Sequence, residues 1–143
     1  MKTTEICVKA VIKYDNKFLI LTRSQSDMLK KNYDIEKDGL YEGVYDIPGG
    51  GIEFGEAPDD ALKRELFEEI GLKLDFEFKV LKTWSILEDN YHLVGLTYFI
   101  ELSQNFDIKL SHEHSDYFWL TKEDILENKG YPEWLKEEIN LVK

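Results

Sequence analysis

The chain has 143 residues, of which 43% are hydrophobic, 13% aromatic and 33% charged, and its formal net charge at pH 7 is −11. This length fits one domain with a hydrophobic core, and the composition is typical of globular rather than disordered proteins. The charge argues against binding to nucleic acid polymers or anionic membranes, which need basic patches, although a bound metal ion would still admit an anionic small substrate. No apolar run is long enough for a membrane span, the N-terminus lacks a signal-peptide pattern, and the single cysteine, Cys7, excludes an internal disulfide. We therefore expect a cytoplasmic protein.

The N-terminal part of the chain predicts a β-hairpin followed by a long loop. Residues 4–13 and 17–23 are rich in strand-forming side chains, and Asp15-Asn16 between them makes a turn. Residues 24–43 are mostly polar and predict a loop. Loops of this length are usually functional or mobile, and a tolerated surface insertion is the alternative interpretation.

Three consecutive glycines predict a turn between two short strands. The first strand, over residues 44–47, is expected to stop at Pro48. Residues 49–51 are all glycine, which allows positive φ angles and close approach of a ligand to the backbone. A second brief strand is expected over residues 52–54.

Residues 58–70 predict a helix that begins at a proline and ends before Gly71. At about 100° per residue, Glu65, Glu68 and Glu69 fall within one arc of roughly 100°. The neighbouring stripe is apolar and faces the core; it contains Leu62, Leu66 and Ile70. Three carboxylates beside a core repel one another unless a cation neutralises them, and hard divalent cations favour oxygen ligands. The helix therefore predicts a metal site.

The C-terminal half predicts more strands and two helices. Extended segments are expected over residues 73–87, 92–102, 107–110 and 117–120. Thr121 and Asp124 form a capping box for a short helix through about Asn128. Pro132 opens a last amphipathic helix, whose inner face carries Trp134, Leu135 and Ile139.

Residues 50–72 match the pattern G-x5-E-x7-R-E-U-x-E-E-x-G-U, in which U is a bulky aliphatic residue. Every defined position is filled, by Gly50, Glu56, Arg64, Glu65, Leu66, Glu68, Glu69, Gly71 and Leu72. With the preceding Pro48-Gly49-Gly50, the hairpin and the segment from Glu113 to Trp119, the chain resembles the Nudix hydrolase family over nearly its whole length. The resemblance implies an α/β/α sandwich: a mixed β-sheet with the Nudix helix on one side and the C-terminal helices on the other. We expect one such domain over residues 1–143.

The resemblance also implies a reaction, which is hydrolysis of a pyrophosphate bond in a nucleoside diphosphate linked to another moiety. The implied cofactor is Mg²⁺ or Mn²⁺, the implied partner is a small nucleotide substrate, and the protein is expected to be a monomer or a homodimer. The implied metal ligands are Gly49 through its carbonyl, Glu56, Glu65, Glu68, Glu69 and Glu113. The implied catalytic residues are Arg64, Glu65, Glu68 and Glu113. Arg64 would hold the carboxylates by ion pairing, Glu65 would be a ligand or the general base, and Glu56 would contribute to the metal site or brace the loop.

The segment His112-Glu113-His114 is the second group of candidate site residues. In an extended segment the two histidines would project to one side and Glu113 to the other. The resemblance favours Glu113 as an extra metal ligand or general base, and an exposed loop glutamate is the alternative. The histidines are expected to face solvent or to be hydrogen-bonded rather than to form a transition-metal pair.

The sequence is less informative about the substrate. It lacks the SQPWPFPxS-like array of NADH-type members and the proline that ADP-ribose-type members carry after the box, which favours a MutT-like enzyme that converts a nucleoside triphosphate to monophosphate and pyrophosphate. The alternatives are hydrolysis of ADP-ribose, a nucleotide sugar or a dinucleoside polyphosphate, a non-catalytic nucleotide-sensing Nudix domain, and an acidic cation-binding module. The loop at residues 24–43 would shift specificity toward a nucleotide sugar if it covered the substrate. Candidates for stacking on a base are Tyr45, Trp84, Tyr91, Tyr98 and Tyr117.

Overall fold

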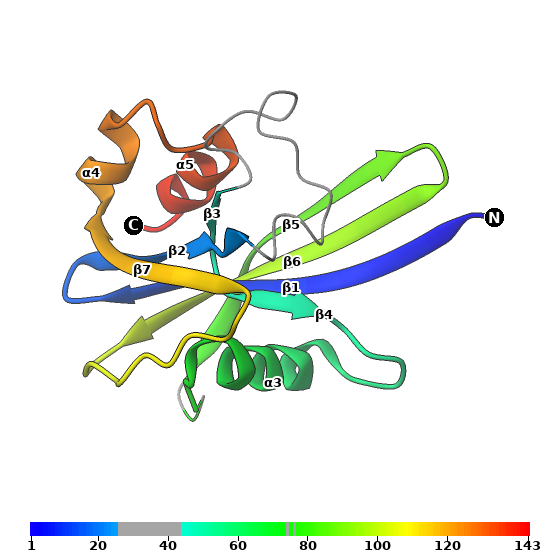
Figure 1. Ribbon diagram of the computed structural model, residues 1–143, viewed down its shortest axis with the longest axis horizontal. Coiled ribbons are helices and arrows are strands. Elements are labelled where there is room, and N and C mark those ends of the chain that lie inside the picture. The colour runs from blue at the N-terminus through cyan, green and yellow to red at the C-terminus, as the bar shows by residue number, and fades with distance from the viewer. Residues whose placement is uncertain (26–43, 74, 76) are drawn as a thin grey trace.

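A computed structural model describes residues 1–25, 44–73, 75 and 77–143 of the chain (Figure 1). Its elements in chain order are β1 (Thr3–Tyr14), β2 (Lys17–Arg23), β3 (Tyr45–Asp46), β4 (Gly49–Gly51), α3 (Pro58–Ile70), β5 (Phe78–Glu88), β6 (Tyr91–Leu102), β7 (His114–Thr121), α4 (Lys122–Glu127) and α5 (Glu133–Asn140). The predicted loop over residues 24–43 lies almost entirely outside the described residues. None of the described helices has the length and apolar character that crossing a membrane requires.

The strands form one mixed sheet in which β1 and β6 are the long central pair. These two strands run parallel along their whole length, and the sheet order is β3-β2-β1-β6-β5. β4 pairs with β1 and β7 pairs with β2, both antiparallel. The predicted N-terminal hairpin is confirmed: Tyr14 pairs with Lys17, and the turn residues Asp15 and Asn16 adopt φ angles of 49° and 62°.

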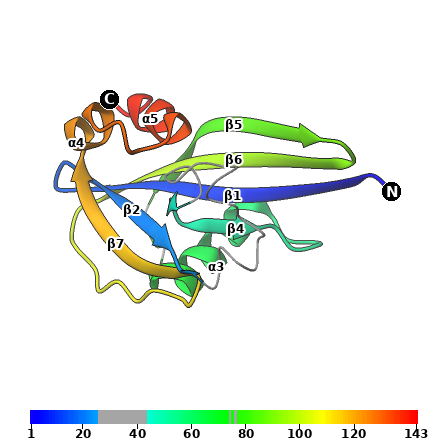
Figure 2. The same cartoon turned by 45° about the horizontal axis from the view of Figure 1, so that its top comes forward.

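Helices cover both faces of the sheet, as the predicted sandwich requires. α3 lies against one face, and α4 and α5 lie against the other (Figures 1 and 2). Alternation along β1 supplies both cores, since Val8, Ala10 and Ile12 pack in the α3 core whereas Val11 packs in the core under α4 and α5. The α3 side buries Leu62, Leu66 and Ile70, which is the apolar stripe predicted beside the carboxylates.

The ends of the helices follow the predicted capping signals. Pro58 occupies the first turn of α3, and the helix ends at Gly71, whose φ of 74° is left-handed. The Gly71 N–H bonds to the Phe67 carbonyl, and the next residue bonds to the Leu66 carbonyl. In α4 the predicted capping box is present, with Thr121 and Asp124 exchanging side-chain to backbone hydrogen bonds.

A turn was predicted at the three consecutive glycines, but residues 49–51 form the strand β4 instead. β4 lies antiparallel to β1, with Lys9 opposite Gly49 and Cys7 opposite Gly51. Only glycine fits at position 49, because a Cβ there would overlap the backbone of β1 and the φ angle is 152°. No strand forms over residues 52–54, so that prediction was wrong.

Two strand predictions beyond α3 also need correction. The strand expected over residues 73–87 begins only at Phe78, where pairing with β6 starts. Residues 107–110 form no strand. Their end instead bonds to the C-terminal turn of α3, where the Lys109 N–H donates to the Ile70 carbonyl at 3.0 Å and the Ser111 N–H to the Glu69 carbonyl at 3.0 Å. These bonds satisfy carbonyls that the helix leaves open and attach the following segment to the acidic helix.

Candidate active site

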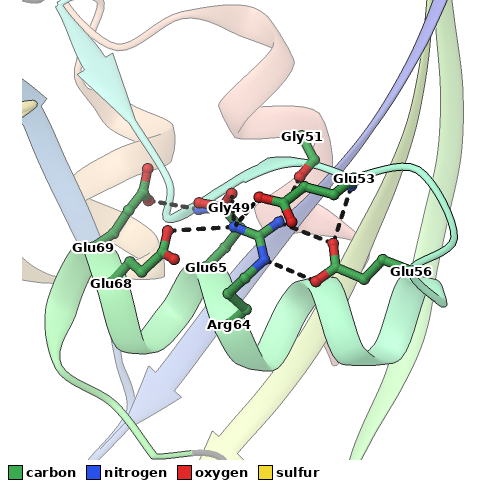
Figure 3. Close-up of polar contacts among 8 residues, drawn as sticks. All are labelled: Gly49, Gly51, Glu53, Glu56, Arg64, Glu65, Glu68 and Glu69. Carbon is green, nitrogen blue, oxygen red and sulfur yellow. Dashed lines mark hydrogen bonds and ion pairs between the residues drawn. The ribbon is translucent and has the colours of Figure 1, made fainter.

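Arg64 lies at the centre of the acidic face of α3, where it donates hydrogen bonds to four groups and lies 3.9 Å from a fifth, the Glu53 carboxylate (Figure 3). Its guanidinium donates two bonds to Glu56, from Nε to Oε2 at 2.8 Å and from Nη2 to Oε1 at 3.0 Å. Nη1 donates to Glu65 Oε1 at 2.9 Å and to Glu68 Oε2 at 3.3 Å. Nη2 also reaches the carbonyl of Gly51 at 2.9 Å. One guanidinium therefore connects the helix carboxylates to the end of β4, as the predicted ion-pairing role of Arg64 requires.

Glu56 is fully engaged in holding the loop between β4 and α3. Besides the two bonds from Arg64, its Oε1 accepts the backbone N–H of Glu53 at 3.0 Å. The bonds from Arg64 and from that N–H lower the pKa of Glu56 to about 2. Of the two roles expected for Glu56, this geometry favours bracing the loop.

Glu65 is half-buried and packs directly on β4. A Cβ on Gly50 would overlap the Glu65 carboxylate, so the missing side chain at Gly50 makes room for it. Burial raises the pKa of Glu65, the bond from Arg64 opposes this, and the charges of Glu68 and Glu113 add to the rise. Glu68 itself is exposed. Glu65 and Glu68 thus lie on one face, as predicted.

Glu69 is the buried member of the helix set, with 5% of its surface exposed. Its Oε2 accepts the Gly49 N–H at 2.8 Å. Burial raises the pKa of Glu69 to about 8, Lys9 and the Gly49 N–H oppose the shift, and the charges of Asp46 and Glu113 add to it. A carboxylate in this position needs a proton or a cation to be stable.

Glu113 reaches Glu69 from the segment before β7. Carboxylate oxygens of Glu69 and Glu113 and a ring nitrogen of His114 all lie within 4.8 Å of one another. The opposite directions expected for Glu113 and the histidines depended on an extended backbone, which does not form here. Residues 112–113 instead form a turn closed by a bond from the His114 N–H to the Ser111 carbonyl at 3.3 Å. His112 is exposed, whereas His114 is buried in the cluster.

His114 is oriented by Asp46, a residue that sequence reasoning did not select. Its Nε2 lies 3.2 Å from Asp46 Oδ2, and Lys9 Nζ lies 3.1 Å from Asp46 Oδ1. Although burial raises the pKa of Asp46, Lys9, His114 and Arg23 together hold it well below its usual range. Nδ1 of His114 is buried and has no hydrogen-bond partner within the described part of the chain. No local sequence signal predicts this group, because Asp46 and His114 are brought together only by the fold.

The donor set fits a divalent cation. Glu69 and Glu113 offer carboxylate oxygens close enough to share one ion, and Glu65 and Glu68 would add oxygens from the same helix. Such oxygens are ligands that Mg²⁺ and Mn²⁺ accept. His114 adds an imidazole nitrogen, which suits a transition metal better than Mg²⁺. The ligand role predicted for the Gly49 carbonyl stays a prediction, since the structure fixes only the bond from the Gly49 N–H to Glu69.

A cavity of about 390 Å³ adjoins this cluster, because Lys9 and Asp46 belong to its wall. Lys82, Trp84, Trp134 and Glu138 also line it. Of the five stacking candidates, Trp84 alone lies in this wall. Tyr45 packs on Tyr131, and Tyr117 is partly exposed on β7. The Tyr91 hydroxyl bonds to Glu5, and the Tyr98 hydroxyl bonds to Asp59. Sequence reasoning missed Glu138 and treated Trp134 as core, because both follow the apolar spacing of the last helix.

The NUDIX domain family model matches residues 5–140. The chain belongs to the Nudix family. It is a Nudix hydrolase, and the predicted membership and sandwich fold are confirmed. Among similar sequences, a protein named nucleoside triphosphatase NudI from an Enterobacter strain is 32% identical over 98 residues, covering 61% of this chain and 68% of that protein. A NudI protein from Escherichia coli is 30% identical over 100 residues, covering 62% of this chain and 69% of that protein.

Solved structures agree on the fold of this Nudix chain. A MutT protein from Methanosarcina mazei superposes with a TM-score of 0.74 at 22% identity, covering 97% of this chain and 92% of that one. A MutT Nudix hydrolase from Burkholderia pseudomallei gives a TM-score of 0.74 at 18% identity, covering 99% of this chain and 100% of that one.

Proposed function

We propose that this Nudix hydrolase cleaves a nucleoside triphosphate to a nucleoside monophosphate and pyrophosphate, with Mg²⁺ or Mn²⁺ as cofactor. The observation that carries the proposal is the set of carboxylates on α3, in which Arg64 holds Glu65 and Glu68 and the buried Glu69 lies beside Glu113 and His114. The similarity to proteins named nucleoside triphosphatase supports a triphosphate as the substrate.

The carboxylates divide into those that would hold metal and those that hold the site together. Glu65, Glu68, Glu69 and Glu113 would bind the cation, with the buried Glu69 nearest to His114 and Glu113. A bound divalent cation neutralises phosphate charge and makes a nearby water more acidic. Arg64 and Glu56 keep the carboxylates in position through the bonds described above. Positioning of this kind supplies most of the catalysis that phosphoryl transfer requires from a protein.

Attack on the pyrophosphate bond also needs a group that accepts a proton from water. Glu65 and Glu113 are the two predicted bases. The bond from Arg64 at 2.9 Å occupies one Glu65 oxygen and weakens its affinity for a proton. Glu113 is half-buried, and its side chain forms no ion pair with the described residues, so we favour Glu113 as the base. A base must be within hydrogen-bond reach of the water. The position of the Glu113 carboxylate, within 4.8 Å of a Glu69 oxygen and a His114 ring nitrogen, supports this role.

A substrate panel tests the proposed function. The protein with Mg²⁺ is incubated with nucleoside triphosphates, oxidised nucleotides, ADP-ribose, nucleotide sugars and dinucleoside polyphosphates, and the products are identified. Monophosphate and pyrophosphate from a triphosphate support the proposal. Turnover of only ADP-ribose, a sugar nucleotide or a dinucleoside polyphosphate would replace it with the corresponding alternative. Binding without turnover of any compound would indicate a sensing domain.

A further inference from the structure

Glu138 is a buried carboxylate with one satisfied and one unsatisfied oxygen. It lies on α5 with 5% of its surface exposed and lines the cavity beside the metal-binding carboxylates. Oε1 accepts a hydrogen bond from Thr97 Oγ1 at 2.8 Å. Oε2 is buried and finds no partner among the residues that the structure describes. An unpaired buried oxygen is costly, so a donor from a ligand in the cavity would stabilise it.

A chain of hydrogen bonds determines that Glu138 Oε1 accepts a hydrogen bond rather than donating one. The Trp84 indole N–H donates to Thr97 Oγ1 at 3.0 Å. Since an indole only donates, the Thr97 hydroxyl is left to give its own proton to Glu138. Glu138 therefore serves as an acceptor at Oε1, and Oε2 is a second acceptor in the ionised carboxylate. Burial raises the pKa of Glu138, whereas the bond from Thr97 and the charges of Lys82 and Lys9 favour the ionised form.

The indole at the start of this chain is held equally firmly. Trp84 pairs with Gly95 across β5 and β6, and a Cβ on Gly95 would overlap the indole ring. The missing side chain at Gly95 therefore lets the ring lie against the β6 backbone. Trp84 and Trp134 both line the cavity, and fixed aromatic walls suit a planar ring.

The cavity wall also offers a donor beside this acceptor. Lys9 is committed to Asp46 and to the Ile47 carbonyl. Among the residues that the structure describes, the Lys82 ammonium pairs with one side chain, the exposed Glu137, at 3.7 Å. Its positive charge also favours the ionised form of Glu138. Exposed pairs of this kind are weak, so the Lys82 ammonium is available to a ligand.

We propose that the cavity binds the base of the nucleotide and selects a ring N–H next to a carbonyl, as in guanine and hypoxanthine. Glu138 Oε2 accepts the ring N–H, and Lys82 donates to the carbonyl oxygen. Adenine fits poorly because it presents an unprotonated ring nitrogen to the carboxylate and an amino group to the ammonium. The identity of the ligand as a nucleotide rests on the proposed function. The cavity volume of about 390 Å³ lies within the range of about 300–1,000 Å³ that is usual for small-molecule sites.

Binding of nucleoside monophosphates tests this inference separately from catalysis. IMP, GMP and AMP contain no pyrophosphate bond, so their affinities are measured by calorimetry in EDTA without turnover. IMP and AMP differ at the ring N–H and the carbonyl alone. We expect IMP and GMP to bind about tenfold or more tightly than AMP, because bound AMP would leave the buried Glu138 oxygen without a donor. If the preference holds but no triphosphate is hydrolysed, the proposed function fails and the base site stands.

The Glu138→Gln variant tests the residue itself. Its amide would place an N–H where Oε2 lies, so the preference for IMP should fall by about tenfold. Glu127→Gln, on the exposed side of α4, is the matched control and should keep the preference for IMP over AMP. Equal affinity of the wild-type protein for IMP and AMP, tighter binding of AMP, or no binding of any monophosphate would overturn the inference without any variant. Retention of the IMP preference in a folded Glu138→Gln protein would overturn the role of Glu138.

Discussion

Arg64 holds Glu56 through two parallel hydrogen bonds, of 2.8 and 3.0 Å, while the same guanidinium reaches Glu65 and Glu68. Lysine cannot reproduce this arrangement, because its ammonium is a single charged point rather than a planar fork. We therefore expect Arg64→Lys to lower the thermal midpoint of unfolding and to weaken metal binding by about tenfold or more, the usual effect of losing a group that orients ligands. Calorimetric titration with Mn²⁺ measures the affinity. An unchanged affinity would show that Arg64 does not organise the carboxylates.

Gly50 and Gly51 offer a matched pair of substitutions on β4. Gly50→Ala places a methyl group into the Glu65 carboxylate, whereas Gly51→Ala meets no atom within 4 Å. Displacing Glu65 should weaken metal binding by about tenfold and slow turnover, while Gly51→Ala should behave as wild type. Metal titration and steady-state rates of the two variants check this. Equal behaviour of the pair would contradict the position of Glu65 in the site.

The raised pKa of Glu69, about 8, predicts how stability and metal binding vary with pH. Without metal, the folded protein keeps a proton on Glu69 that the unfolded chain releases above its ordinary pKa of 4.5. The free energy of unfolding should therefore fall as pH rises from about 4.5 to about 8. Metal needs the ionised form, so saturating Mn²⁺ should reduce this slope, and its binding at pH 7 should release protons.

Chemical denaturation in EDTA and in Mn²⁺ measures the slopes, and calorimetry in buffers of different ionisation enthalpy counts the protons. Glu69→Gln is the control, because it carries no proton to lose and should flatten the slope in EDTA. Metal binding without proton release, or an equal slope in Glu69→Gln, would contradict this assignment.

The buried group around Asp46 predicts a stability effect outside the metal ligands. Asp46→Asn keeps the shape but removes the charge that Lys9 and His114 share. Leaving the partly exposed Lys9 ammonium without its carboxylate should cost up to about 3 kcal/mol, the lower end of the range for broken buried pairs. Urea denaturation of the variant measures the loss. Glu133→Gln, which removes a 3.9 Å contact between Lys136 and a glutamate whose side chain is 85% exposed, should change stability by less than about 1 kcal/mol.

Features of the fold and the site that depend on local spacing could be predicted from the sequence. Residues 58–70 alternate between apolar and acidic positions with a helical period, so the helix, its cap at Gly71 and the shared face of its carboxylates follow directly. The role of Gly50 as a gap for Glu65 could not be predicted, because it depends on how β4 crosses α3.

Contacts between distant residues escaped prediction for a similar reason. Asp46 and His114 are 68 positions apart, and periodicity does not indicate which strands bring them together. The alternation expected around Glu113 failed because a local turn, closed by Ser111, replaced the extended backbone. Glu138 is in register with buried neighbours on α5, so only the structure shows that it faces Thr97 and a cavity.

Phosphorus NMR of one triphosphate reaction, run with the wild-type protein and with Glu68→Gln, tests whether the α3 carboxylates support metal-dependent release of pyrophosphate. Glu68 is exposed on α3, so the variant should keep the wild-type circular dichroism spectrum. In Mg²⁺ the wild-type protein should give equal amounts of monophosphate and pyrophosphate, and EDTA should stop the reaction. Glu68→Gln should lose well over about tenfold in rate, whereas Glu123→Gln on α4 should not. A Glu68→Gln protein with a wild-type spectrum and a rate reduced by less than about tenfold, or diphosphate and phosphate as products, would contradict the account.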